Sequence, residues 1–377
     1  MADTHRAIIL PAVNEPLSLQ SVPTPTPQPG QVLVKPLAVP IVGYTRDVLT
    51  GKRPYPLPVP FTPGVSSIAR VEATGPDAVS LKPGQLVYVD TTVRARDYAA
   101  GEKGACILQG FMAGTTPEAR HLAEHAWKHG SWAERQIVPL ENVHVLDEEV
   151  LLHQKGYRLS QLTWINALLV PYGGWLAAGL QPGETAIVCF ATGHFGARAI
   201  DVALAMGAGR VVGVGRRIEA LKAVQARYPA GKVSVVAITG NKTADAAALR
   251  AATPRGGAGA DCYLDLSPPM DPALASSHIQ SAIAALKVGG RAVLMGGIAD
   301  KVSLPYGELM FRNITVRGNF MYGQDAPAKL IRMIESGNLS LGHLDAEEFR
   351  FEEYEKAIDA AARERKEGSQ VVLRIQE

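Results

Sequence analysis

From Thr185 onward, uninterrupted apolar runs alternate with stretches of helical periodicity, and this alternation constrains the fold most strongly. Apolar runs without polar interruption are typical of parallel strands that helices cover on both faces. Strand and helix in strict alternation predict βαβ units, whose common arrangement is a doubly wound α/β fold with a parallel sheet. The strands are expected at 185–190, 210–214, 233–237, 262–265 and 291–295, with helices at 196–206, 218–226 and 273–286.

The first 150 residues follow a different pattern. Short alternating segments at 6–10, 31–38, 68–74 and 86–89 are separated by proline and glycine, which predicts a β-rich domain. The proline-rich stretch 22–30 predicts a stiff surface connection, because proline cannot donate a hydrogen bond to a sheet.

The two ends of the chain are expected to build one domain together. The tail after Thr315 predicts a helix at 351–366 and a final strand at 370–375, after the alternating pattern has ended. A β-rich first part and a mixed tail suggest a domain made of residues 1–160 and 313–377, with a second domain at 161–312 between them.

Composition narrows the functional classes. The chain has 377 residues, enough for two cores, and its formal charge of +2 gives no reason to expect nucleic acid or an anionic membrane as partner. Three cysteines cannot form a disulfide framework. The amino terminus has no signal-peptide pattern, and charged residues interrupt the most apolar region, 186–214. We therefore expect a reduced, cytoplasmic protein.

The first predicted βαβ unit carries a phosphate-binding motif. The strand at 185–190 leads into Ala191-Thr192-Gly193-His194-Phe195-Gly196, where a helical pattern begins. This is the dinucleotide fingerprint with alanine in place of its first glycine. Gly193 would let the backbone approach a pyrophosphate, Gly196 would let the helix pack on the strand, and the helix amino terminus would face the phosphates. The alternative is a tight turn that binds no ligand.

The end of the second strand indicates which dinucleotide is bound. Val214 is followed by Gly215, Arg216 and Arg217, where an acidic residue would bind the adenosine ribose of NAD. No carboxylate is present, and two guanidiniums stand where a 2′-phosphate would lie. The sequence predicts NADP(H) rather than NAD, although one of the two arginines could simply be solvated surface.

Short segments along the whole chain accompany the phosphate motif. They are GQVLVK at 30–35, Gly64 followed by ARVEATG at 69–75, LKPGQLV at 81–87, GSWAE at 130–134, GLQPGET at 179–185 and GGRAVLMGG at 289–297. In this order and spacing, the chain resembles the medium-chain dehydrogenase/reductase superfamily, the alcohol-dehydrogenase-like proteins, over essentially its full length. The resemblance implies a GroES-like catalytic domain built from both termini, a Rossmann domain between them and a cofactor in the cleft. It also implies a homodimer, or a tetramer, that pairs through the edge strand at 313–318.

The positions that hold catalytic zinc in members of this family carry other residues here. They correspond to Val42, to Val65 with Ser66 after it, and to Pro171, none of which is a thiolate, imidazole or carboxylate. The four-cysteine structural lobe, expected between Val93 and Met112, has only Cys106. The chain is therefore similar to a zinc-independent branch of the family, and no metal is expected.

One competing metal pattern lies elsewhere in the chain. His121, Glu124 and His125 read as H-x-x-E-H, and His129 follows one helical turn later. Two such histidines on one helix face could bind zinc in a metalloprotease. The alternative is an exposed helix that carries polar histidines.

Without zinc, a hydrogen-bond donor must stabilise the charge that develops on the substrate oxygen. Tyr44 lies where zinc members keep a proton-relaying hydroxyl, and Tyr44, Thr45 and Asp47 could form a proton path. The alternative is a packed tyrosine beside a surface aspartate. Other candidates from the strand edge and the resemblance are Trp132, Trp164 and Tyr172 for the substrate pocket, each equally plausible as core, and Ser267, Gly296 and Gly297 for the cofactor.

The leading functional interpretation is a zinc-independent, NADPH-dependent oxidoreductase that acts on a carbonyl or alcohol of a small molecule. Reduction of an activated C=C bond, as in an enone, or of a C=N bond is the nearest rival, because an enolate needs less electrophilic help than a ketone. A catalytically inactive NADPH-binding module would also keep these motifs. A fold that performs non-redox chemistry has no positive residue evidence. The sequence leaves the substrate itself open, because loops shape the pocket.

Overall fold

The computed structural model describes residues 3–98, 104–363 and 367–376. It divides into two compact units, Met1–Asn166 with Ser340–Glu377, and Ala167–Leu339. The division differs from the expected domain limits of 160 and 313. Residues 313–339 belong to the second unit because β15 (Thr315–Gly318) pairs with β14 (Leu286–Leu294) in the parallel sheet.

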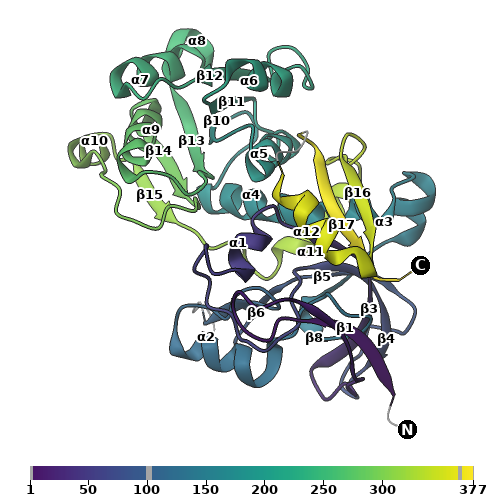
Figure 1. Ribbon diagram of the computed structural model, residues 1–377. Helices are drawn as coiled ribbons and strands as arrows, with labels where there is room; N and C mark the ends of the chain where they lie inside the picture. The colour runs from purple at the N-terminus through teal and green to yellow at the C-terminus, as the bar shows by residue number, and fades with distance from the viewer. Residues whose placement is uncertain (1–2, 99–103, 364–366, 377) are drawn as a thin grey trace. The chain divides into compact units, whose positions relative to one another are not determined.

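The second unit contains the doubly wound sheet that the alternating pattern predicted (Figure 1). Its strands lie in the order β12-β11-β10-β13-β14-β15, and all neighbours are parallel. The strand order reverses between β10 and β13, and ligands bind such sheets at the carboxyl ends of the strands beside this reversal. The remaining strands are β10 (Thr185–Cys189), β11 (Arg210–Gly215), β12 (Val233–Ala237) and β13 (Ala260–Asp265).

Helices cover the strands of this unit and bury the sheet. Every residue of β10 is buried, as expected of a central strand between two helical layers. Among the described residues, no helix combines the length and the apolar character needed to cross a bilayer. The helices are α4 (Ile165–Ala178), α5 (His194–Ala205), α6 (Ile218–Gln225), α7 (Lys242–Ala251), α8 (Pro254–Gly257), α9 (Pro272–Ala284), α10 (Tyr306–Phe311) and α11 (Ala326–Glu335).

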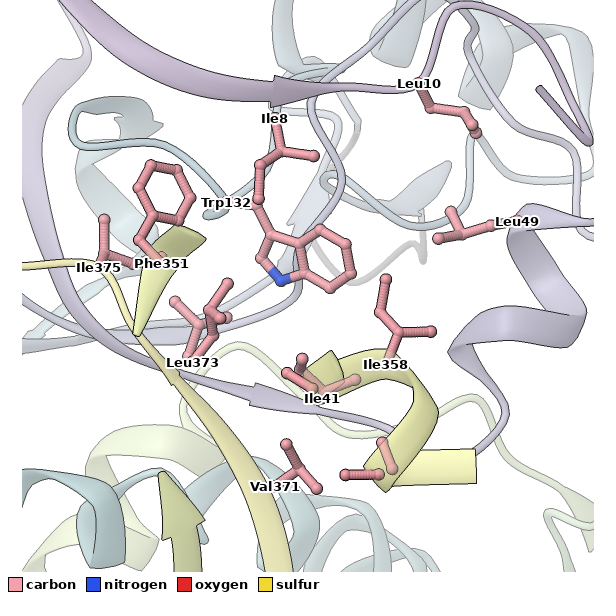
Figure 2. Close-up of a cluster of buried hydrophobic side chains, with 14 of the residues drawn as sticks. Ile8, Leu10, Ile41, Leu49, Trp132, Phe351, Ile358, Val371, Leu373 and Ile375 are labelled. Carbon is pink, nitrogen blue, oxygen red and sulfur yellow. The ribbon is translucent and has the colours of Figure 1, made fainter. Parts of the chain in front are cut away.

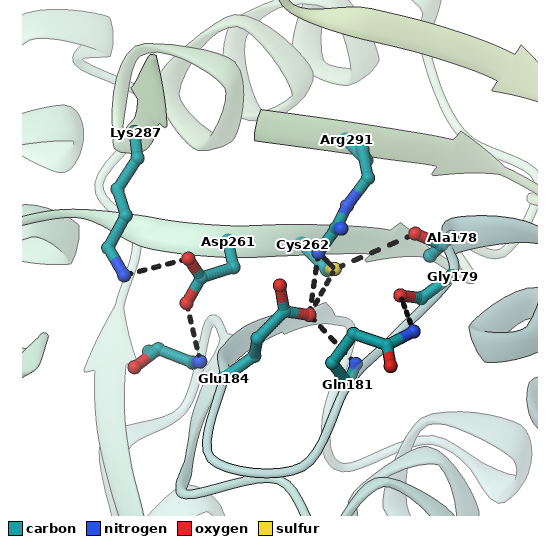
Figure 3. A network of polar contacts seen from close by, with 9 residues as sticks. Ala178, Gly179, Gln181, Glu184, Asp261, Cys262, Lys287 and Arg291 are labelled. Atoms are coloured by element: carbon teal, nitrogen blue, oxygen red, sulfur yellow. Dashed lines mark hydrogen bonds and ion pairs between the residues drawn. The ribbon is translucent and has the colours of Figure 1, made fainter. Parts of the chain in front are cut away.

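A polar network joins β13 and β14 to the turn before β10 (Figure 3). One Nη of Arg291 lies 2.6 Å from the Glu184 carboxylate and 2.8 Å from the Cys262 sulfur. Lys287 donates to Asp261 over 2.7 Å in the same region. Burial raises the pKa of Cys262 to about 12 although Arg291 lowers it, so the side chain is a thiol. The network therefore holds these strands in register.

The first unit is built around a mainly antiparallel sheet. Its strands lie in the order β16-β17-β3-β4-β5-β9, β8 pairs with β3, and only β16 and β17 are parallel. Two further pairs, β1 with β2 and β6 with β7, lie outside this sheet. The strands are β1 (Thr4–Ile9), β2 (Ser18–Pro23), β3 (Gln31–Ile41), β4 (Ser67–Thr74), β5 (Leu86–Val89), β6 (Thr92–Arg94), β7 (Cys106–Leu108), β8 (Gln136–Pro139), β9 (Val143–Val145), β16 (Asp345–Arg350) and β17 (Ser369–Arg374).

Both ends of the chain build this unit, since β17 pairs antiparallel with β3. The helix expected at 351–366 begins with a 3-10 turn and continues as α12 (Tyr354–Ala362), while residues 364–366 lie outside the described residues. The other helical segments are α1 (Thr45–Leu49), α2 (Pro117–Leu122), α3 (Leu159–Leu162), π-helices at Ala123–Trp127 and Glu149–Gln154, and 3-10 turns at Leu140–Asn142 and Phe351–Glu353.

The expected stiff connection at 22–30 is partly a strand. Val22 pairs with His5, and Pro23 pairs with Thr4 as the last residue of β2. Proline has no backbone N–H, but at the end of an edge strand this hydrogen-bond donor is not needed. Pro23 can therefore end β2 without disrupting its pairing with β1.

Trp132 lies in the centre of an apolar cluster of this unit (Figure 2). Its side chain is 1% exposed and is surrounded by residues from both chain ends, among them Ile8, Ile41 and Phe351. Within the described structure its indole Nε1 has no hydrogen-bond partner. Of the two roles expected for Trp132, the surrounding apolar side chains favour the core residue over the substrate pocket.

We expect Trp132→Ala to lower the free energy of unfolding by about 3–5 kcal/mol, because the removed indole leaves a cavity that the core cannot refill. Trp132→Phe keeps most of the ring volume and should cost less than half as much. Urea unfolding of the full-length variants measures both values. Equal stability of Trp132→Ala and the unchanged protein would contradict the core assignment.

Candidate functional site

The loop between β10 and α5 is held by close backbone contacts. The Ala191 N–H donates to the Val214 carbonyl of β11 over 2.7 Å, and the Gly193 N–H donates to the Phe190 carbonyl over 3.2 Å. A Cβ added to Gly196 would lie 1.8 Å from the Phe190 oxygen. Only glycine allows this approach, so the first turn of α5 sits directly against the end of β10.

The amino terminus of α5 has the geometry of an anion site. Gly193 is the N-cap residue in an extended conformation, and no side chain within the described residues caps this end of the helix. The N–H groups of the first turn, including those of His194 and Phe195, have no intrahelical acceptors. Thr192 is half-buried, whereas Gly193 and His194 are exposed. The loop can therefore present N–H donors and the helix dipole to a pyrophosphate.

Arg216 and Arg217 follow the carboxyl end of β11, and both are exposed. Gly215 is buried against Leu221, where an added Cβ would lie 3.2 Å from the leucine side chain. The hydrogen bond from Ala191 to the end of β11 brings this turn next to the phosphate loop. The two arginines thus follow the strand that neighbours the loop, where a 2′-phosphate would lie in folds of this kind.

The end of β13 carries a buried hydrogen-bond network. Ser267 Oγ donates to Asp265 Oδ1 over 2.5 Å and lies 2.8 Å from His278 Nε2. Tyr263 also donates to Asp265 Oδ1, over 2.9 Å. His278 Nδ1 lies 3.1 Å from the Leu274 carbonyl. This network fixes the turn after β13 at the same edge of the sheet as the phosphate loop.

The predicted cofactor residues lie side by side in two neighbouring segments, Ser267 after β13 and Gly296 and Gly297 after β14. The Gly297 N–H donates to the Ser267 carbonyl over 2.7 Å. A Cβ on Gly296 would lie 2.5 Å from Asp265 Oδ2, so the strand-end carboxylate requires glycine there. The Ser267 side chain is engaged by Asp265 and His278, a partnership that the sequence analysis missed because His278 comes from α9.

In the first unit, Tyr44 lies in a cluster of aromatic side chains. Its ring centroid is 6.4 Å from that of Tyr55 and 6.1 Å from that of Phe111, and Tyr55 and Phe111 are 5.7 Å apart. The guanidinium carbon of Arg53 lies 4.0 Å from the Tyr44 centroid. The sequence analysis did not identify Arg53, Tyr55 or Phe111, because only the fold brings the three segments together.

Burial raises the pKa of the Tyr44 phenol well above its ordinary value. The neighbouring Tyr55 raises it further, and the positive charge of Arg53 opposes these effects. Tyr44 is therefore a neutral O–H donor throughout the neutral range.

The expected path through Thr45 and Asp47 is not connected by side-chain hydrogen bonds among the described residues. Thr45 is buried, whereas Asp47 is exposed on α1. The Asp47 carbonyl instead accepts the Arg53 N–H over 2.8 Å. The structure thus brings Tyr44 next to Arg53 rather than next to the Thr45 and Asp47 side chains.

The positions that correspond to zinc ligands are packed with groups that do not bind zinc. Val42 and Val65 are buried, and Ser131 donates to the Val65 carbonyl over 2.6 Å. Ser66 is 1% exposed, and Pro171 lies inside α4. Aliphatic side chains and a proline ring offer no donor atom, so the residues present do not fit a catalytic zinc site.

The H-x-x-E-H segment does not form a three-ligand site in the described part of the chain. The rings of His121 and His125 lie 4.3 Å apart on the exposed side of the helix. His129 instead uses Nδ1 to accept the Thr62 N–H over 3.2 Å, and burial lowers its pKa to about 4.

The two remaining pocket candidates are buried. Trp164 is 1% exposed and donates its Nε1 to the Asp345 carbonyl over 3.0 Å, so it ties α3 to β16. Tyr172 is 5% exposed on α4, and burial raises the pKa of its phenol. Trp164 thus has a core role in the first unit, whereas Tyr172 belongs to the second unit.

Comparisons with known proteins agree with this architecture. The family model for the alcohol dehydrogenase GroES-like domain matches residues 28–148, and that for zinc-binding dehydrogenase matches residues 195–336. A probable D-xylulose reductase A from Aspergillus clavatus is 26% identical over 311 residues, which cover 79% of this chain and 76% of that protein.

Solved structures share the fold at low sequence identity. The 2R,3R-butanediol dehydrogenase of Bacillus subtilis has a TM-score of 0.76 at 18% identity, covering 99% of this chain and 100% of that chain. A putative zinc-binding dehydrogenase from Sinorhizobium meliloti, bound to NADP, has a TM-score of 0.73 at 17% identity with the same coverage. With both family models matched in order along the chain, this protein belongs to the medium-chain dehydrogenase/reductase superfamily of oxidoreductases.

Proposed function

We propose that this oxidoreductase uses NADP(H). The observation that carries the proposal is the pair of exposed arginines, Arg216 and Arg217, directly after the strand beside the phosphate loop. The first turn of α5 would hold the pyrophosphate, and the two guanidiniums would pair with the 2′-phosphate. The two segments with Ser267, Gly296 and Gly297 would hold the rest of the coenzyme. When bound, the nicotinamide supplies or accepts a hydride.

We propose that the substrate is a small carbonyl compound or the corresponding alcohol, and that Tyr44 is the proton donor. Reduction leaves negative charge on the substrate oxygen, and a neutral phenol can donate its proton to that oxygen. Burial keeps Tyr44 protonated, and solvent returns the proton after each cycle. Thr45 and Asp47 would then lie close to Tyr44 in the sequence, but their side chains would not relay its proton.

The reaction would proceed without zinc. Val42, Val65 and Pro171 cannot replace the thiolate and imidazole ligands of zinc members, and a phenol is a weaker electrophile than a metal ion. The same observation favours a second candidate, the reduction of a C=C bond conjugated to a carbonyl. The enolate formed there needs less stabilisation than the alkoxide of an unactivated ketone.

Homodimer formation and a cytoplasmic location complete the proposal. Strand β15 is an edge of the parallel sheet, and an unpaired edge can pair with the same strand of a second copy. Tyr306 and Phe311 on the preceding helix are 78% and 82% exposed, and such a dimer would cover these side chains.

The free cysteines fit a reducing compartment, which is the basis for the proposed cytoplasmic location.

The double variant Arg216→Ala with Arg217→Ala should raise KM for NADPH about 10- to 100-fold, since it removes charge-assisted hydrogen bonds to one phosphate. KM for NADH should change little. Lys222→Ala, an exposed cation on α6, serves as the control and should leave both values unchanged. Steady-state kinetics with each coenzyme measures the effect, and an equal loss for NADPH and NADH would contradict the assignment.

Tyr44→Phe should lower kcat for carbonyl reduction about 100-fold or more, because the proton donor is lost while the ring still packs. In the unchanged enzyme, the reduction rate should stay constant through the neutral range and fall only above the ordinary phenol pKa of about 10. Rates with ketone and enone panels at graded pH provide the measurement. Unchanged turnover in Tyr44→Phe would remove Tyr44 from the mechanism.

Dialysis against a chelator should leave kcat and KM unchanged, and added zinc should not raise either, because no described residue set fits a catalytic zinc ion. Elemental analysis of the purified chain before and after dialysis provides the control for metal content. Loss of activity on chelation, with recovery by zinc alone, would overturn zinc independence.

A further inference from the structure

Arg53 is a half-buried cation without an anionic partner in the part of the chain that the structure describes. Its guanidinium carbon lies 4.0 Å from the Tyr44 ring centroid and 5.1 Å from that of Tyr55. Most other partly buried arginines of the first unit are paired; Arg135, for example, donates to Glu72 over 2.9 Å. The Arg53 guanidinium therefore lies among aromatic rings, and no described residue accepts a hydrogen bond from it.

The backbone fixes Arg53 in this place. The Arg53 N–H donates to the Asp47 carbonyl over 2.8 Å, and its own carbonyl accepts the Tyr55 N–H over 2.7 Å. Phe111, which is 3% exposed, packs against Tyr44 and Tyr55 and closes the cluster. Because the rings hold the guanidinium before any ligand arrives, little side-chain entropy remains to be lost on binding.

The unused donors match a carboxylate. Aromatic rings take the faces of a guanidinium by cation–π contact, and its N–H groups point outward in its own plane. A carboxylate accepts two such N–H groups in parallel, and this pairing is stronger where aromatic walls lower the local dielectric. The single guanidinium of Arg53 matches the single negative charge of a carboxylate. The expected 2′-phosphate site, by contrast, has two guanidiniums, those of Arg216 and Arg217.

We propose that Arg53 binds the carboxylate of the substrate, and that the substrate class is therefore a small oxo acid, or the corresponding hydroxy or unsaturated acid. This inference rests on the proposed function, in which Tyr44 donates to the reacting oxygen. Arg53 lies over the Tyr44 ring, so the carboxylate and the reacting oxygen are close to each other. Short acids, with the two groups a few bonds apart, satisfy both residues.

Binding of levulinate and of levulinamide to the full-length protein tests this assignment. The two probes have the same shape and the same ketone, and only levulinate is charged. Isothermal titration should show levulinate binding about 10-fold or more tighter than levulinamide, as expected for a charge-assisted bidentate pair. Equal affinities, or no saturable binding of levulinate, would overturn the proposal.

Variants assign the effect to Arg53. Arg53→Met should remove the preference for levulinate, and Arg53→Lys should retain only part of it, because lysine keeps the charge but not the planar pair of donors. Lys52→Met is the matched control, an exposed cation in the same loop, and should bind levulinate as the unchanged protein does. Full preference for levulinate over levulinamide in Arg53→Met would contradict the assignment of the carboxylate to Arg53.

The same titrations separate this inference from the proposed function. Tyr44→Phe keeps the ring under Arg53, so it should keep the preference for levulinate over levulinamide even when turnover is lost. Normal turnover in Tyr44→Phe with intact levulinate preference would reject Tyr44 as donor but keep the carboxylate site. Loss of turnover in Tyr44→Phe with no levulinate preference in any variant would keep the donor and reject Arg53.

Discussion

The contact between Gly196 and the Phe190 carbonyl is the constraint on which the coenzyme site depends. With no Cβ at this position, the first turn of α5 approaches the end of β10 more closely than any other residue would allow. That approach directs uncapped N–H groups towards the carboxyl edge of the sheet. The bond from Ala191 to Val214 then brings the end of β11, with Arg216 behind it, next to the same loop.

In our proposal, a cluster of rings and one guanidinium in the first unit takes the place of a catalytic metal ion. A zinc ion both polarises a carbonyl and stabilises the oxygen anion that forms. In our account Tyr44 takes over the second task as a neutral phenol, and Arg53 orients the substrate through its charge. Burial among aromatic side chains serves both residues, because it keeps the phenol protonated and strengthens an ion pair with the guanidinium.

The sequence predicted those features that depend on neighbouring residues. The strands of the parallel sheet, the loop between β10 and α5 and the turn after β11 are local patterns, so periodicity and spacing sufficed to place them. Features that depend on distant segments were missed. His278 reaches Ser267 from another helix, and Arg53 meets Phe111 only in the folded chain. The position of Trp132 within the core follows from packing by both chain ends, which no local pattern reveals.

The most direct test of the coenzyme site uses fragments that cannot react. Adenosine 2′,5′-bisphosphate and adenosine 5′-monophosphate differ only in the phosphate that Arg216 and Arg217 are expected to bind. Calorimetric titration should give an affinity for the bisphosphate about 10-fold or more higher, and raised salt should reduce that difference. Equal affinity of the two fragments would contradict the account.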